Sequence, residues 1–91
     1  MAGNPHIAEV VAALASYLAA NPHACDSAEG IGRWWLMDQG DVTQALRGAL
    51  DWMVRHGYLQ VQTATDGRSR YRRHASVEAL RNASAEFHRT N

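Results

Sequence analysis

A change of hydrophobic period at Gly57 constrains this chain more than any other feature. Before it, apolar residues recur every three or four positions over 42–56, which is the period of one face of an α-helix. After it, apolar and polar residues alternate over 58–63, as in a half-buried β-strand. A second alternating segment follows the pair Asp66-Gly67, a sequence that favours hairpin turns. The chain is therefore predicted to pass from a helix, through a left-handed glycine cap, into a two-stranded hairpin.

Three more helices are expected from stripes of apolar residues that begin at capping residues. The first begins at the Asn-Pro pair at 4–5 and ends at the pair at 21–22. The second covers about 27–37, after a capping box at 26–29, and the last begins at Ser76. The stripe of the first helix contains Ile7, Val10, Val11, Leu14 and Leu18. The stripe of the last helix contains Val77, Leu80, Ala83 or Ser84, and Phe87.

The length of 91 residues allows a single domain, 1–91, with one modest hydrophobic core. Hydrophobic residues make up 46% of the chain, which indicates a globular rather than a disordered protein. Its one cysteine, Cys25, excludes an internal disulfide and a multi-cysteine zinc site, and this suits a reducing cytoplasm. No apolar run is long enough to span a membrane, and the first residues lack a signal-peptide pattern. We therefore expect a cytoplasmic protein.

The charges are balanced over the whole chain but not along it. Nine basic residues, all of them arginine, balance nine acidic ones, which excludes a generally basic nucleic-acid coat protein. Residues 55–74 nevertheless contain five arginines against one aspartate, whereas residues 1–32 contain three acidic residues and no arginine. The absence of lysine and the abundance of alanine indicate a bacterial genome rich in G and C rather than a function.

The helix at 42–56 ends in a pattern that is typical of one protein family. Two apolar residues stand seven and four positions before a glycine, and two more follow that glycine directly. These five residues are Leu50, Met53, Gly57, Tyr58 and Leu59. Together with the order of helix, helix, helix, hairpin and helix, the pattern resembles the winged helix-turn-helix superfamily of bacterial DNA-binding domains. The resemblance covers about 6–88 and implies an α+β, mostly helical fold with three helices, a two-stranded hairpin wing and a C-terminal helix.

The resemblance also implies which residues would contact double-stranded DNA. In the family, the exposed face near the start of the third helix, here 42–56, enters the major groove. The matching positions are Thr43, Gln44, Arg47, Gly48 and Asp51. Glutamine reads adenine and arginine reads guanine through paired hydrogen bonds. On the wing at 58–73, strand alternation would place three arginines on one face, toward phosphates or the minor groove. These are Arg68, Arg70 and Arg72.

Ordinary structural roles explain the same residues without DNA. The face of 42–56 also fits a solvated helix surface, and Asp38, Asp51 and the expected helix cap Asp41 would repel phosphate. Charged side chains on a hairpin also prevent strand-to-strand aggregation. On the other face of the hairpin, Tyr71 is expected to join Leu59 and Val61 over the core.

The three tryptophans allow a second interpretation. Trp35 shares the apolar face of the second helix and is expected in the core. Trp34 and Trp52 fit either the core or an exposed aromatic patch, and such a patch is typical of a protein interface. With Phe87 of the last helix, they are the candidate residues for a homodimer or for a protein partner. The alternative function is therefore a winged-helix interaction module that does not bind DNA.

Enzyme chemistry is not indicated by any motif. The sequence lacks a phosphate-binding glycine loop and a Ser-His-Asp order, so neither catalysis nor a cofactor is expected. His23 and Cys25 are the only close pair of potential metal ligands, and no metal site is expected from two residues. A redox-sensing role of Cys25 is a lesser alternative, because the neighbouring Asp26 opposes a reactive thiolate. The sequence thus favours a small DNA-binding regulator of transcription.

Overall fold

The computed structural model describes residues 7–35 and 43–90, without the side chains of Trp34, Thr43 and Thr90. The fold is α+β and mostly helical, as expected, with one small antiparallel sheet. In chain order the elements are α1 (Ile7–Ala20), β1 (Cys25–Asp26), α2 (Ala28–Gly30), the π-helical turn η1 (Ile31–Trp35), α3 (Thr43–Arg55), β2 (Leu59–Thr63), β3 (Ser69–Arg73), α4 (Val77–Arg81) and α5 (Ala83–Thr90). The predicted cap pair at 4–5, the end of the second helix at Met37 and the cap Asp41 lie outside the described residues.

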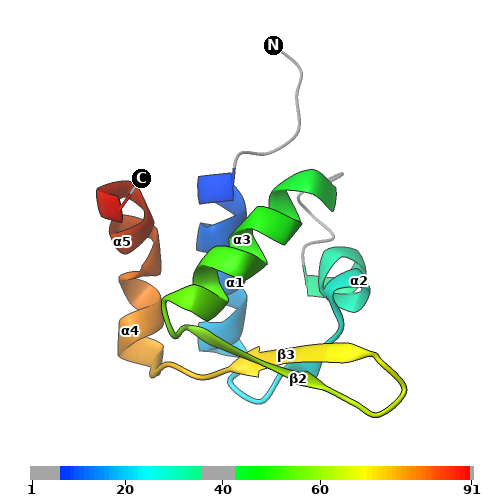
Figure 1. Ribbon diagram of the computed structural model, residues 1–91. Helices are drawn as coiled ribbons and strands as arrows, with labels where there is room; N and C mark the ends of the chain where they lie inside the picture. Colours follow the sequence, from blue (N-terminus) through cyan, green and yellow to red (C-terminus); the bar gives the residue numbers. More distant parts are fainter. Residues whose placement is uncertain (1–6, 36–42, 91) are drawn as a thin grey trace.

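Helix α1 is the centre of the molecule. It packs against α3 on one side and against α4 and α5 on the other, and the hairpin of β2 and β3 runs along one end of this bundle (Figure 1). Its buried residues are Val10, Val11, Leu14, Ala15 and Leu18, which confirms the predicted stripe apart from Ile7. Ile7 is 38% exposed, because it lies in the first turn of α1, at the edge of the packed region.

Within the predicted helix over 27–37, the described residues form two short pieces, α2 and the π-helical turn η1. Ser27, not Asp26, is the helix cap, and its Oγ accepts a hydrogen bond from the N–H of Gly30 at 3.1 Å. Asp26 instead accepts from the N–H of Ser27 through its Oδ1 at 2.8 Å, and it belongs to strand β1. A side chain at position 30 would overlap this carboxylate, so the close approach requires glycine. Buried Ile31 and half-buried Trp35, stacked on Tyr17 at 4.9 Å between ring centroids, still face the core as predicted.

The end of α3 confirms the predicted glycine cap. Gly57 has φ +80°, and its N–H donates to the carbonyl of Val54 at 3.1 Å. The N–H of Tyr58 donates to the carbonyl of Met53 at 2.8 Å. These two bonds form a Schellman motif, which satisfies carbonyls at the end of the helix and turns the chain into β2.

The hairpin is confirmed, and its turn contains three residues. The N–H of Gly67 donates to the carbonyl of Ala64 at 3.0 Å, and the N–H of Ala64 donates to the carbonyl of Arg68 at 2.8 Å. Gly67 has φ +87°, the conformation that a three-residue loop with a glycine bulge requires.

The sheet has three strands instead of the two expected. Strand β3 lies in the middle, with β2 on one side and the two-residue β1 on the other, all antiparallel. Cys25 pairs with Arg72, and Asp26 pairs with Tyr71. A strand of two residues is too short to show an alternating pattern, so the sequence alone gave no sign of β1.

The C-terminal helix is divided in two. Ser76 caps α4 as predicted, because its Oγ accepts from the N–H of Ala79 at 3.1 Å. The helix is interrupted at Asn82, whose N–H donates to the carbonyl of Ala79, three residues back, at 3.0 Å. Leu80 and Ala83 nevertheless face α1 and are buried, so the predicted apolar stripe continues across the interruption.

Trp52 lies in the core and forms no exposed aromatic patch. Only 4% of its surface is exposed. Its ring centroid lies 5.4 Å from that of Tyr58 in a stacked arrangement, and Phe87 meets it edge-on at 5.2 Å. Because Phe87 of α5 packs against this ring, the residue that the sequence offered as a possible interface residue connects α3 to the C-terminal helix instead.

Replacement of Trp52 by alanine should therefore destabilise the fold strongly. We expect Trp52→Ala to lower the free energy of unfolding by about 3–5 kcal/mol, the range for large buried aromatic residues. Phe87→Ala is the matched comparison and should cost less, because this ring is only half-buried. Urea unfolding followed by circular dichroism measures both. A change below about 1 kcal/mol for Trp52→Ala would contradict its place in the core.

The burial of Tyr58 predicts a loss of stability at alkaline pH. Burial raises the pKa of the Tyr58 hydroxyl above 10.0, Glu86 raises it further, and Arg89 lowers it. The folded state therefore favours the neutral phenol, whose contribution to stability is complete below the unfolded pKa and is lost as the pH rises through the folded pKa. Between about pH 9 and pH 11, Tyr58→Phe should lose less stability than the wild type in urea unfolding. Equal losses in the two proteins would refute this.

Candidate nucleic-acid interface

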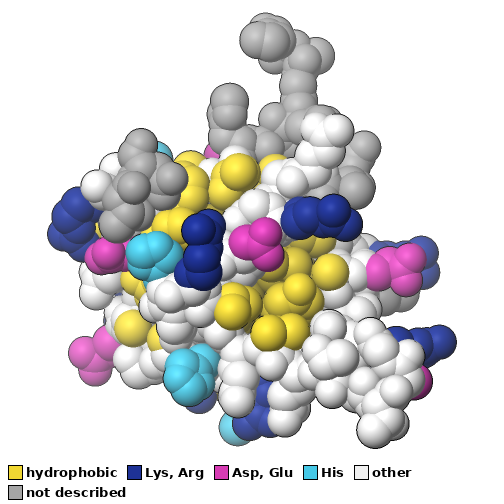
Figure 2. All heavy atoms as spheres, in the orientation of Figure 1, with side chains coloured by type: hydrophobic (Ala, Val, Ile, Leu, Met, Phe, Trp, Pro, Cys, Tyr) yellow, Lys and Arg dark blue, Asp and Glu magenta, His cyan; other side chains and the backbone are white. Residues whose placement is uncertain are grey.

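Helix α3 presents one polar face to solvent. Residues on this face are exposed at helical spacing, while the opposite side of the helix is buried. The exposed residues are Gln44, Arg47, Asp51 and Arg55. Figure 2 shows basic and acidic side chains along this side of α3, with hydrophobic surface next to them. Thr43 begins α3, but its side chain lies outside the description.

Gly48, which the sequence placed among the DNA-contacting residues, packs against α1 instead. A Cβ at position 48 would lie 2.7 Å from Cδ1 of Ile7, closer than such carbon atoms approach each other. Gly48 therefore sits where α1 and α3 come together, and its lack of a side chain accommodates Ile7. Its role in the structure is packing, so it adds no group that could read a base.

The charge of the α3 face is small. Arg47 and Arg55 contribute two positive charges, and Asp51 between them contributes a negative one. Nε of Arg55 donates to the backbone carbonyl of Asp51 at 3.4 Å, which places the guanidinium along the last turns of the helix. The face thus offers one glutamine and one arginine near its beginning, where a groove-binding helix contacts base edges.

The hairpin presents two of its arginines as strand alternation predicts. Arg70 and Arg72 are exposed on one face and pair with Gln62 and Gln60 of β2. Arg68 stands between the three-residue turn and β3, and its side chain is 86% exposed. No carboxylate of the described residues forms an ion pair with Arg70 or Arg72. These two guanidinium groups are therefore available to an anionic partner.

Arg68 differs from the other two because an acidic residue of the turn accompanies it. Its Nε lies 3.8 Å from Oδ2 of Asp66, and its backbone N–H donates to Oδ1 of the same carboxylate at 3.0 Å. Because Arg68 stands one residue before β3, the expectation that it shares the strand face of the other two arginines stays a prediction.

The opposite face of the hairpin covers the core only at its base. Leu59 is buried and Tyr71 packs against the core, as predicted. Val61, their expected companion, is 39% exposed, because the hairpin extends beyond the helices that would cover it. Arg70 and Arg72 project from the face of the hairpin opposite Leu59 and Tyr71, which is the face away from the core.

Arg73 is a residue whose role sequence reasoning missed. Its half-buried guanidinium donates from Nε to the carbonyl of Pro22 at 3.3 Å and from Nη1 to the carbonyl of Ala75 at 2.6 Å. It thereby joins the turn after α1 to the segment before α4. The Arg-Arg pair at 72–73 was visible, but its carbonyl partner lies 51 residues away in the chain and had no local signal.

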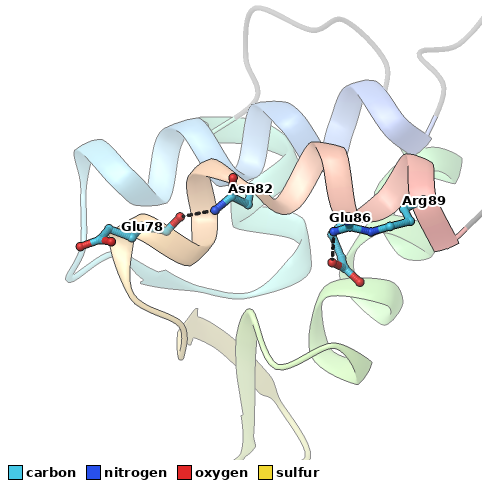
Figure 3. Close-up of polar contacts among 4 residues, drawn as sticks. All are labelled: Glu78, Asn82, Glu86 and Arg89. Carbon is cyan, nitrogen blue, oxygen red and sulfur yellow. Dashed lines mark hydrogen bonds and ion pairs between the residues drawn. The ribbon is translucent and has the colours of Figure 1, made fainter.

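The candidate protein-interface residues are mostly not exposed. Trp52 is in the core, Phe87 is half-buried against it, and the side chain of Trp34 lies outside the description. On the surface beside Phe87, Nη2 of Arg89 forms an ion pair with Oε1 of Glu86 at 2.7 Å (Figure 3).

Nearer the interruption of this helical segment, Nδ2 of Asn82 donates to the carbonyl of Glu78 at 3.2 Å (Figure 3). This end of the molecule thus carries polar contacts local to the helix rather than an exposed aromatic patch.

The described ranges contain neither a cluster of metal ligands nor a helix fit to cross a membrane. No three His, Cys, Asp or Glu side chains in them come close enough together to hold a metal ion. None of the helices in them combines the length and the hydrophobicity that crossing a bilayer requires. Comparison of the chain with protein-family models, curated proteins and solved structures finds no match.

The two carbonyl contacts of Arg73 predict a structural role for this residue. Arg73→Ala should lower the free energy of unfolding by about 1–2 kcal/mol, because hydrogen bonds to a charged donor contribute in this range when half-buried. Arg70→Ala, which removes an exposed arginine of the same strand, should stay within about 0.5 kcal/mol. Thermal or urea unfolding compares the two variants. Equal effects of both would show that the carbonyl contacts do not stabilise the fold.

Proposed function

We propose that this protein is a small winged-helix protein that binds double-stranded DNA and regulates transcription. The observation that carries the proposal is the hairpin directly after α3, with Arg70 and Arg72 exposed on one face and joined to no carboxylate of the described residues. In this proposal α3 is the recognition helix and the hairpin is the wing. The packing of α1 on α3 and the antiparallel pairing of β2 with β3 are consistent with such an arrangement.

Each part of the proposed interface has a distinct chemical role. Gln44 and Arg47, exposed near the beginning of α3, would donate and accept hydrogen bonds at base edges in the major groove. Arg70 and Arg72 would bind phosphates, which positions the protein without reading sequence. For both sets to touch one duplex, the DNA would have to lie against α3 and the hairpin together.

A second function, a winged-helix module that binds a protein, is favoured by two observations. Asp51 lies in the middle of the exposed α3 face, where it would repel a phosphate backbone. Val61 is exposed on the hairpin, next to the half-buried ring of Tyr71. An apolar strand face beside a polar helix face suits a protein surface better than a nucleic acid.

The salt dependence of DNA binding tests the proposal. Random-sequence duplex DNA is titrated with the protein at about 50 and about 200 mM salt, where phosphate contacts weaken steeply. Each lost phosphate contact should reduce the slope of log K against log salt by about 0.9. Replacement of both Arg70 and Arg72 by alanine should therefore weaken binding and reduce the slope by the amount expected for about two phosphate contacts, because both guanidinium groups are exposed.

Arg81→Ala is the control, since it removes an exposed arginine of α4 and leaves the hairpin unchanged. It should keep the wild-type slope. A folded wild-type protein that binds no duplex at about 50 mM salt would reject DNA binding and favour the protein-binding module. A slope that the double variant leaves unchanged would remove the hairpin from the interface.

A further inference from the structure

A pocket of about 440 Å³ opens at the base of the hairpin, on the side away from its turn. Its lining comes from two segments that are far apart in the sequence. The lining residues are Pro22, His23, Ala24, Cys25, Arg72 and Arg73. The volume lies within the range of about 300–1,000 Å³ that small-molecule sites occupy.

The shortness of β1 explains why this space exists. The pairing of β1 with β3 ends at Cys25 and Arg72. Before Cys25 the chain turns, and the N–H of Ala24 donates to the carbonyl of Asn21 at 3.0 Å. On the β1 side of β3, no strand residue therefore pairs with Arg73, and the space between this turn and the end of β3 stays open.

The pocket is positively charged. Arg72 and Arg73 line it together with His23, and no acidic residue is part of the lining. Within the described part of the chain, neither arginine forms an ion pair with a carboxylate. Two guanidinium groups without a counter-charge are an arrangement that binds oxyanions.

One of the two cationic groups is held in position before any ligand arrives. Arg73 donates from Nε to the carbonyl of Pro22 and from Nη1 to the carbonyl of Ala75. Its Nη2 makes no hydrogen bond to the described residues, so it remains available to a ligand. Because this side chain is already ordered, an anion that binds it loses less conformational entropy than one that must order a free arginine.

We infer that this pocket binds a phosphate group of a small molecule. A phosphate monoester carries about −1.5 to −2 charges at neutral pH, which matches two guanidinium groups better than a single carboxylate does. The same chemistry occurs in the phosphates of a DNA backbone, and the test separates these two sources. The inference does not depend on DNA binding, since the pocket is formed by the turn after α1 and the end of β3.

Amide chemical shifts measure the binding directly. The ¹⁵N-labelled protein is titrated with inorganic phosphate at constant ionic strength, with chloride as the balancing anion. We expect saturable shifts at the amides of His23, Ala24 and Cys25, which line the pocket. Phosphate should also slow the alkylation of Cys25 by iodoacetamide, a neutral reagent that reports on the only thiol of the chain.

Two matched variants decide whether the pocket is responsible. Arg72→Gln removes the charge of a lining arginine that forms no ion pair with a described carboxylate, and it should weaken phosphate binding at least about tenfold, the loss expected for one charged hydrogen-bond partner. Arg70→Gln removes an exposed arginine two residues away on the same strand face and should keep the wild-type affinity. Equal affinities of the two variants, or shifts that do not saturate, would overturn the inference.

A parallel titration with duplex DNA identifies the source of the phosphate. If free phosphate shifts the pocket amides and the duplex does not, the ligand is a small molecule, whatever the outcome for DNA binding. If only the duplex shifts them, and Arg72→Gln removes these shifts, the small-molecule ligand is rejected and the pocket belongs to the DNA interface. If neither free phosphate nor the duplex shifts the pocket amides, the pocket binds no phosphate group and the inference fails.

Discussion

The burial of one side of α1 against three other helices is the contact on which the rest of the structure depends. Val10, Leu14 and Leu18 are fully buried there, and α3, α4 and α5 all pack on this helix. A chain of 91 residues is long enough to bury only one modest hydrophobic core. The hairpin is attached to that core only at its base, through Leu59 and Tyr71. Its outer face and the outer face of α3 are therefore left to solvent and to partners.

Three arginines of strand β3, Arg70, Arg72 and Arg73, differ in their contacts and exposure. Arg73 lies against two backbone carbonyls and stabilises the fold, whereas Arg70 is exposed and joined to no carboxylate of the described residues. Arg72 lies between these roles, since it shares the exposed face with Arg70 and lines the pocket with Arg73. The two proposals therefore use one guanidinium in common. An anion in the pocket would neutralise a charge that a DNA phosphate would otherwise meet, so the two ligands would oppose each other.

The predictions that the structure confirms all depend on residues close together in the chain. The Gly57 cap needs only the preceding turn of α3, the Ser76 cap needs the next three residues, and the hairpin needs its own turn. The features that sequence reasoning missed depend on distant partners. Strand β1 exists because Cys25 meets Arg72, and a two-residue strand has no period to detect. The candidate site divides in the same way: the exposure of Gln44, Arg47, Arg70 and Arg72 followed from periodicity, whereas the pocket did not.

The sequence by itself determined where the helices and the hairpin lie, because apolar spacing, glycine and capping residues act within a few positions of the chain. It also determined that a basic segment follows α3. The apolar stripes also predicted which side of α1 and of the hairpin base is covered, but only the tertiary structure decided the burial of the residues outside them or at their edges. Trp52 is buried because Tyr58 and Phe87 pack on its ring, and Val61 is exposed because no helix reaches that part of the hairpin. The physical reason is that long-range packing, not local periodicity, decides which residues a neighbouring element covers.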